Sequence, residues 1–204
     1  MEKKKKTSRN MKLYFSFLLG IILFLKYNYY FKMEKKNIND FVVIFDLDYT
    51  IWPFWVDTHV SPPFHIKKIK DNGEKIIEDE YGYEIKLYPE VLQILEKAKK
   101  EKIIMGTVSR TLSPNEGRKL LKLFDIEKYF ISCEFDTGTK TKSMKKIAKL
   151  AGIEGGIKHC ILYDDESRNI HDVEREGGIG VLLNNGLTMK DFENGIKIFH
   201  SRNK

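Results

Sequence analysis

Two carboxylates, Asp46 and Asp48, follow directly after the apolar run Phe41–Phe45. The continuous apolar, β-branched character of that run predicts a buried parallel strand that ends at Asp46. Ligands of open α/β sheets bind outside the carboxyl ends of the strands. An Asp in that place can attack phosphorus and form an aspartyl phosphate. Asp48 would face a different side of the loop, where it can protonate a leaving oxygen and then take a proton from water.

Further polar groups recur where the pattern predicts the end of a strand or the start of a helix. In chain order they are Ser109 with Arg110, then Lys140, then the pair Asp164 and Asp165. Each has an ordinary interpretation by itself, because a strand-end Asp can cap a helix and a lysine can belong to a solvated face. Their recurrence at one predicted sheet edge favours a single site.

Attack by a carboxylate on a phosphate ester brings two anions together, so the reaction needs positive charge. A Mg²⁺ ion held by Asp46 and by Asp164 or Asp165 would supply it, because this ion prefers oxygen ligands. Positive and hydrogen-bonding groups for the phosphoryl oxygens would come from Ser109, Arg110 and Lys140.

The elements that must position these groups alternate between strands and helices. Strands are predicted at residues 41–45, 103–108, 129–134, 159–163 and 179–183, and helices from 89, from 113, and over 139–151, 167–175 and 189–199. This alternation predicts an α/β fold, a three-layer sandwich with helices on both faces of a parallel sheet. Between the first strand and the first helix, a Trp-, Phe- and Pro-rich loop over 52–64 precedes three short strands at 66–70, 74–79 and 83–88. They form a small β excursion, too short for a separate domain.

Aromatic residues follow the carboxylates closely. Trp52, Phe54 and Trp55 would either form a wall for a substrate beside Asp46 or pack the loop onto the body of the domain. His59 lies in the same loop and shows no partner that would make it catalytic, so a hydrogen-bonded loop histidine is expected.

The chain has 204 residues, 42% hydrophobic and 32% charged, which suits one domain with its own core. Its formal net charge is +7, but residues 1–32 hold eight Lys/Arg and one Glu, whereas residues 33–204 hold 28 residues of each sign. Because the longer part is neutral, nothing in the charge indicates nucleic acid as a partner. Cys133 and Cys160 lie in apolar runs without metal-ligand spacing and are expected to be reduced core thiols.

Residues 1–32 have the composition of a targeting or anchoring extension. The basic run Lys3–Lys6 precedes the apolar stretch Leu13–Leu25, and the aromatic stretch Tyr27–Phe31 follows it. The apolar stretch is shorter than the ~20 residues that span a bilayer, although the aromatic residues suit an interface. Either residues 13–31 associate with a membrane and lead the protein to the secretory pathway or an anchored state, or translation starts at Met33 and the protein is cytoplasmic. The predicted domain is residues 33–204.

The four sets of polar residues resemble the four motifs of the haloacid dehalogenase (HAD) superfamily. The first motif, Asp-x-Asp-x-Thr, is met at Asp46, Asp48 and Thr50. The other three are met at Ser109, at Lys140 and at the acidic pair Asp164 and Asp165.

A longer stretch of sequence resembles one particular family within this superfamily. Residues Phe45–Phe64 read FDLDYTIWPFWVDTHVSPPF, which is similar to the signature of the eukaryotic magnesium-dependent phosphatase family within the superfamily. Other segments that fit are Leu87–Val91, Ser109–Thr111, Leu123–Asp125, Lys128–Ile131 and Asp164–Ile170. Together they cover roughly residues 40–200, and the departures in the signature, Ile51 for Leu and Ser61 for Asp, are small.

The resemblance implies a Rossmann-like core with a minimal cap, Mg²⁺ as cofactor and an aspartyl-phosphate intermediate. It implies that Asp46 is nucleophile and metal ligand, and that Asp48 is general acid/base and binds the metal through its backbone carbonyl. Asp165 would be the direct metal ligand of its pair, supported by Asp164. Contacts with the phosphoryl group or the substrate are implied for Leu47, Ser109, Arg110 and Lys140. The substrate would be a phosphorylated small molecule or phosphoprotein, such as phosphotyrosine or fructosamine 6-phosphate, and the protein is expected to be a monomer.

Three other functions are compatible with parts of the pattern. A phosphate-receiving signalling domain also uses Asp, Ser/Thr and Lys, but its acidic pair comes near the first strand and its nucleophile later, the reverse of the order here. A non-catalytic, membrane-tethered binding module would not need the complete set of chemical groups. A phosphotransferase with the same intermediate differs only in the acceptor, which the sequence does not show.

Overall fold

The computed structural model describes residues 20–21, 40–71 and 75–203. The chain divides into two units, Met1–Ile38 and Asn39–Lys204. Of the first unit only Gly20 and Ile21, which are helical and exposed, are described, so the predicted extension lies almost entirely outside the described residues. Among the described residues no helix has both the length and the hydropathy to cross a membrane.

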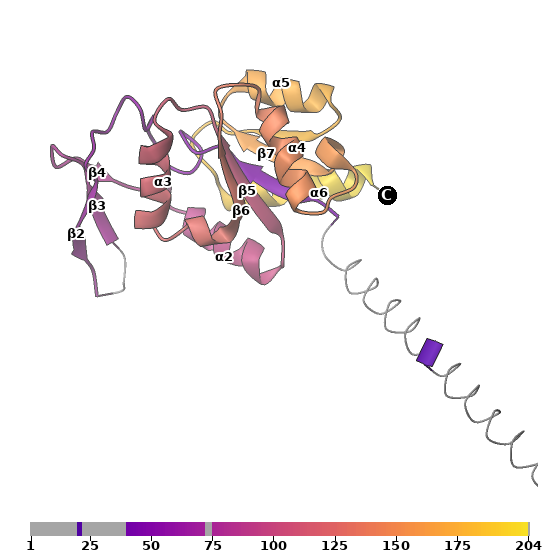
Figure 1. Ribbon diagram of the computed structural model, residues 1–204, viewed down its shortest axis with the longest axis horizontal. Coiled ribbons are helices and arrows are strands. Elements are labelled where there is room, and N and C mark those ends of the chain that lie inside the picture. Colours follow the sequence, from indigo (N-terminus) through magenta and orange to yellow (C-terminus); the bar gives the residue numbers. More distant parts are fainter. Residues whose placement is uncertain (1–19, 22–39, 72–74, 204) are drawn as a thin grey trace, which may run out of the picture. The chain divides into compact units, whose positions relative to one another are not determined.

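A five-stranded parallel sheet forms the centre of the second unit (Figure 1). Its strands are β1 (Val42–Phe45), β5 (Ile104–Ser109), β6 (Phe130–Phe135), β7 (Cys160–Asp164) and β8 (Ile179–Leu182). Their spatial order is β6-β5-β1-β7-β8, so the chain runs outward from β1 in one direction and then returns to the other side of β1. Such a reversal point is where open α/β sheets bind ligands.

Helices cover both faces of this sheet, as the alternating pattern predicted. They are α2 (Val91–Lys100), α3 (Pro114–Leu123), α4 (Lys140–Leu150), α5 (Ser167–Arg175) and α6 (Met189–Arg202), with the 3-10 turns η1 (Glu127–Tyr129) and η2 (Gly156–His159) before β6 and β7. Apolar residues of α2, α3 and α6 belong to one buried cluster, and those of α4 and α5 to another. The architecture is therefore three layers with two cores, and the Rossmann-like prediction is confirmed.

Strand β1 shows why the central strands are apolar throughout. Successive side chains of a strand point to opposite faces of its sheet. Val43 and Phe45 accordingly lie in the cluster with α2, α3 and α6, whereas Val42 and Ile44 lie in the cluster with α4 and α5. All four are at most 1% exposed, so the strand is fixed from both sides and holds the residue that follows it.

The predicted β excursion is a second, antiparallel sheet of three strands, β2 (His65–Ile69), β3 (Lys75–Glu78) and β4 (Glu84–Ile85), in the order β2-β3-β4. Ile77 and Ile85 are buried in the core cluster of α2, α3 and α6, whereas every residue of β2 is exposed. The excursion is thus attached to the main unit through β3 and β4.

Asp79 connects this excursion with the Trp-rich loop. One carboxylate oxygen accepts hydrogen bonds from the amides of Tyr81 (2.9 Å) and Tyr83 (2.8 Å), and the other accepts one from the Ser61 amide (3.1 Å). Burial by itself would raise the pKa of Asp79, but the amides of Tyr83, Ser61 and Tyr81 outweigh it and lower the pKa. The carboxylate therefore stays ionised and fixes the loop that passes the candidate site.

We expect Asp79→Asn to lower the free energy of unfolding at pH 7 by about 1–3 kcal/mol, because it replaces an ionised acceptor of three amide hydrogen bonds. Since the pKa of Asp79 is lowered by folding, its stabilising contribution is present above the unfolded pKa of ~3.9 and is lost as pH falls through the folded value. The difference from the parent protein should therefore shrink in acid. Urea unfolding at pH 7 and in acid measures this difference in stability, with the exposed Asp71→Asn as the control. Equal stability of the two variants at pH 7 would contradict the role of the Asp79 carboxylate as acceptor of the three hydrogen bonds.

Candidate active site

The register in which β1 pairs with β7 brings Asp46 and Asp164 together at one edge of the sheet. Phe45 at the end of β1 pairs with Thr107 of β5 and with Tyr163 of β7. The next residue, Asp46, continues the ladder, since its amide donates to the Tyr163 carbonyl (3.0 Å). Asp46 therefore lies beside Asp164, the last residue of β7, at the reversal point of the strand order.

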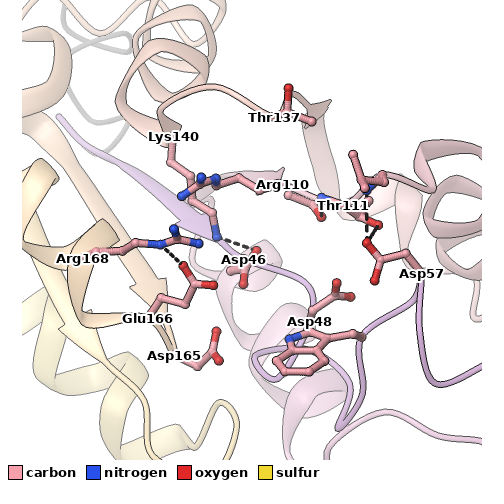
Figure 2. A pocket seen from close by; sticks show the side chains of 13 residues that line it. Asp46, Asp48, Asp57, Arg110, Thr111, Thr137, Lys140, Asp165, Glu166 and Arg168 are labelled. Carbon is pink, nitrogen blue, oxygen red and sulfur yellow. Dashed lines mark hydrogen bonds and ion pairs between the residues drawn. The ribbon is translucent and has the colours of Figure 1, made fainter.

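Lys140 lies between these two carboxylates. Its Nζ is 2.6 Å from Asp46 Oδ1 and 2.7 Å from Asp164 Oδ2 (Figure 2 draws the pair with Asp46). The Lys140 side chain is 4% exposed and that of Asp164 is 0% exposed, so both charges are removed from water. Desolvation would lower the pKa of Lys140, but the carboxylates of Asp46 and Asp164 outweigh it and raise the pKa. Lys140 is therefore a fixed positive charge next to Asp46.

Asp164 accepts three further hydrogen bonds, which come from two groups. The Asn169 amide Nδ2 donates to both of its oxygens (3.0 and 3.1 Å), and the Glu166 backbone amide donates to Oδ1 (2.9 Å). With Lys140 added, both oxygens of Asp164 are engaged. Asp165 is only partly buried, and its side chain is the freer of the pair.

Asp48 stands in a tight turn that follows Asp46. The amides of Thr50, Ile51 and Trp52 all converge on the Leu47 carbonyl (3.2, 2.8 and 3.3 Å). Tyr49 in this turn has a φ of 52°, a left-handed conformation that is uncommon outside glycine. The turn returns the Trp52 indole to the Asp48 carboxylate, with Nε1 donating to Oδ1 at 2.7 Å.

Burial raises the pKa of Asp48 to about 6, although the hydrogen bonds from the Trp52 indole and the Val56 amide lower it. The pKa of a group that gives up and takes back a proton during turnover is best placed near the working pH. The environment of Asp48 thus suits the general acid/base role that the sequence predicts.

The end of β5 and the loop that follows it supply Ser109 and Arg110, two of the groups predicted to bind phosphoryl oxygens. Ser109 is buried, and its Oγ accepts from the Thr111 amide (3.4 Å). Asp57 Oδ2 accepts from Thr111 Oγ1 (3.3 Å) and from the Leu112 amide (3.2 Å), and so ties the Trp-rich loop to this one (Figure 2). Arg110 Nη1 lies 3.4 Å from Asn169 Oδ1, whereas its buried Nε has no hydrogen-bond partner among the described residues.

A pocket of about 370 Å³ opens above these residues. Figure 2 shows Lys140, Arg110 and Arg168 on one side of it and Asp48 with Asp57 on the other. Trp55 and Leu112 also line it, and they are 48% and 80% exposed. The pocket therefore combines cations that are paired with carboxylates, the further acidic groups Asp48 and Asp57, and apolar surface open to solvent.

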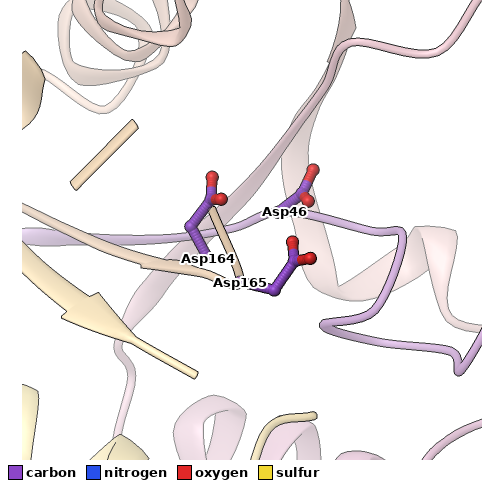
Figure 3. A group of neighbouring side chains, drawn as sticks. All are labelled: Asp46, Asp164 and Asp165. Atoms are coloured by element: carbon purple, nitrogen blue, oxygen red, sulfur yellow. The ribbon is translucent and has the colours of Figure 1, made fainter. Parts of the chain in front are cut away.

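Three of the carboxylates fit a divalent cation. Asp46, Asp164 and Asp165 each place one oxygen so that these atoms all lie within 4.8 Å of one another (Figure 3). Burial and then the charge of Asp164 raise the pKa of Asp165, and burial also raises the pKa of Asp46, with Lys140 acting against it. Three carboxylates around one ammonium leave negative charge that a cation of the Mg²⁺ type would neutralise, and carboxylate oxygen is the donor such an ion prefers.

The structure brings together nearly all of the residues singled out from the sequence. The exception is Leu47, whose side chain is 1% exposed and lies in the core, so a contact with substrate would have to use its backbone amide. The aromatic loop residues were expected either to form a wall for a substrate or to pack the loop onto the domain. Trp52 and Phe54 pack, since they are buried and stacked on each other (centroids 5.6 Å), whereas Trp55 lines the pocket. The roles of the individual groups stay predictions.

Several residues of the site were missed by the sequence reasoning. They are Asp57, Leu112, Thr137, Glu166, Arg168 and Asn169. Asp57 stands within the signature stretch and Asn169 within the segment after the acidic pair, so their positions were visible. Their contacts were not visible, because each bridges elements that are remote in sequence.

Two solved structures with a similar fold are described as HAD hydrolases. A family IA HAD hydrolase of Entamoeba histolytica is 15% identical over 77% of this chain and 99% of its own, with a TM-score of 0.52. A HAD-superfamily hydrolase of Ehrlichia chaffeensis is 16% identical over 80% of this chain and 97% of its own, also with a TM-score of 0.52. The fold is thus the HAD-like α/β fold.

Sequence comparison identifies the family within that fold. The profile described as Acid Phosphatase matches residues 40–202, and the chain belongs to this acid phosphatase family. The human protein named Magnesium-dependent phosphatase 1 is 35% identical over 158 residues, 78% of this chain and 86% of its own. A HAD-like hydrolase superfamily protein of Schizosaccharomyces pombe is 35% identical over 144 residues, 66% of this chain and 80% of its own. The resemblance read from the signature stretch is confirmed.

We expect Trp52→Phe to move the pH dependence of phosphatase activity upward. The indole donor stabilises ionised Asp48, so its removal raises the pKa of Asp48 above its value of about 6. The measurement is the apparent pKa in kcat against pH with p-nitrophenyl phosphate. Phe54→Leu, which disturbs the same stacked pair without removing a donor to Asp48, serves as control. An unchanged or lower apparent pKa in Trp52→Phe would contradict the conclusion that the Trp52 indole lowers the pKa of a catalytic Asp48.

Proposed function

We propose that the protein is a Mg²⁺-dependent phosphatase that hydrolyses phosphate monoesters through an aspartyl phosphate on Asp46. One observation carries the proposal: Asp46 stands at the end of β1 with an ammonium at 2.6 Å and two further carboxylates close enough to share a cation. The name of the human relative, Magnesium-dependent phosphatase 1, agrees with the metal. Asp46, Asp164 and Asp165 would hold the ion, which neutralises phosphoryl charge when bound.

The first half-reaction transfers the phosphoryl group to the protein. An Asp46 carboxylate oxygen attacks phosphorus, and the bond from phosphorus to the ester oxygen breaks. Asp48 gives its proton to that oxygen as it leaves, which its raised pKa permits. Lys140 and the groups at Ser109 and Arg110 hold the negative oxygens of the phosphoryl group.

The second half-reaction returns Asp46 to its starting state. Asp48, now ionised, takes a proton from a water molecule, whose oxygen attacks phosphorus and releases inorganic phosphate. The pocket is open to solvent at the exposed side chains of Trp55 and Leu112, so water can reach the intermediate. This favours hydrolysis over the alternative of transfer to another acceptor.

The lining of the pocket favours a substrate with an aromatic leaving group, such as phosphotyrosine. Trp55 is fixed by stacking on His59 (centroids 5.1 Å) and by an edge contact with Tyr49 (5.4 Å), yet remains half-exposed. A fixed, exposed indole offers a flat apolar surface to a phenyl ring. A sugar phosphate such as fructosamine 6-phosphate would gain less from this surface and is the competing substrate class.

Asp46→Asn should reduce turnover of p-nitrophenyl phosphate by about a thousandfold or more, because an amide cannot form the intermediate. EDTA should abolish activity and added Mg²⁺ should restore it. Steady-state assays of residues 1–204 make the comparison, with Asp172→Asn as control, because Asp172 is partly exposed and does not line the pocket. Undiminished turnover in Asp46→Asn, or full activity in EDTA, would refute the mechanism.

Trp55→Ala should raise KM for aryl phosphates by roughly 2- to 12-fold, the equivalent of one aromatic contact, and change KM for sugar phosphates less. Assays with phosphotyrosine peptides and fructosamine 6-phosphate measure the difference. Tyr81→Ala, which removes an aromatic side chain that is 81% exposed in the small sheet, is the control. An equal effect on both substrate classes would contradict an aryl platform at Trp55.

A further inference from the structure

Arg168 lines the pocket but has no role in the phosphoryl transfer proposed for Asp46 and Asp48. It is the second residue of α5, and its side chain is 62% exposed. The first turn of a helix carries partial positive charge, which disfavours a cation there. Helix stability therefore does not account for an arginine at this place.

Hydrogen bonds through Glu166 and Asn169 connect Arg168 with Arg110, which is proposed to bind the phosphoryl group. Its Nε is 2.5 Å from Glu166 Oε2, and the same oxygen accepts from Asn169 Nδ2 at 3.2 Å. Asn169, which is 2% exposed, uses its Oδ1 for Arg110 Nη1. One buried amide and one carboxylate thus fix the two guanidinium groups relative to each other, on the side of the pocket that also holds Lys140 (Figure 2).

Glu166 occupies only the Nε edge of Arg168. Its terminal nitrogens have no hydrogen-bond partner within the described part of the chain. A guanidinium held along one edge still offers two parallel N–H donors, the geometry that matches a carboxylate or phosphate. Lys140 is buried and Arg110 is partly buried, whereas the Arg168 side chain is 62% exposed. Arg168 is therefore the cation that the pocket lining presents to solvent.

We propose that Arg168 forms a subsite for a second anionic group, a carboxylate or phosphate, on the leaving part of the substrate. Arg110 then contacts the phosphoryl group being transferred, and Arg168 the second oxyanion. This rests on the proposed phosphatase function and narrows it to phosphate esters that carry a further negative charge near the ester. The pocket of about 370 Å³ is larger than a phosphoryl group requires and leaves room for such a leaving group.

The test compares two esters that differ by one anionic group, phenyl phosphate and 4-carboxyphenyl phosphate, on the full chain with Mg²⁺. The parent protein should have the lower KM for the carboxylated ester, and Arg168→Gln should reduce that preference by at least about fivefold. Arg168→Lys keeps the charge and should retain part of the preference. Raising the salt concentration should weaken it in the parent protein.

Arg175→Gln is the matched control. Arg175 lies on the same helix, is 75% exposed on its side chain and pairs with Asp172 as Arg168 pairs with Glu166, but it does not line the pocket. The parent preference should persist in this variant. A parent protein without preference, or Arg168→Gln with the parent preference intact, would overturn the subsite.

Binding without turnover separates the subsite from the reaction. Calorimetric titration with benzylphosphonate and with 4-(phosphonomethyl)benzoate should give tighter binding of the carboxylated compound, and Arg168→Gln should remove the difference. If the parent protein hydrolyses neither ester, the proposed function fails and these titrations alone decide the subsite. Equal affinities of the parent protein for the two phosphonates would refute it.

Discussion

The site depends on the two ion pairs that the buried ammonium of Lys140 makes with Asp46 and Asp164. Asp46 and Asp164 terminate adjacent strands, and with Asp165 they would place three carboxylates at one sheet edge with little water to screen them. Two short ion pairs with Lys140 offset part of that repulsion. Burial is the main reason why the pKa values of Asp46 and Asp165 are raised nonetheless. A bound cation would stabilise these buried carboxylates in their ionised form.

The loop that leaves β1 couples the acid/base group to the rest of the pocket. Its tight turn at Tyr49 brings the Trp52 indole to Asp48, and its Asp57 binds the loop after β5. Asp79 then anchors its far end to the small sheet. A single segment therefore sets the position of Asp48 relative to Ser109. The same loop also provides apolar surface to the pocket through Trp55.

Much of the fold and of the site could be predicted from the sequence, because the relevant signals are local. The continuous apolar run of β1 reflects burial on both faces, and each strand-end polar residue follows such a run. What could not be predicted is how side chains are paired across the sheet edge. Asn169 contacts Asp164 and Glu166 within its own segment, but it reaches Arg110, 59 residues away in sequence, only because the loop after β5 lies beside the start of α5. Likewise, Trp52 and Trp55 look alike in sequence, yet Trp52 is buried in the core and Trp55 is 48% exposed at the pocket.

The central claim is that Asp46 becomes covalently phosphorylated. The most direct test is rapid acid quenching of the protein during turnover of a ³²P-labelled aryl phosphate, followed by neutral hydroxylamine and peptide mass spectrometry. The account predicts protein-bound phosphate that is stable in acid, is released by hydroxylamine, and leaves a hydroxamate on Asp46. Turnover without protein-bound phosphate, or a hydroxamate on another residue, would contradict it.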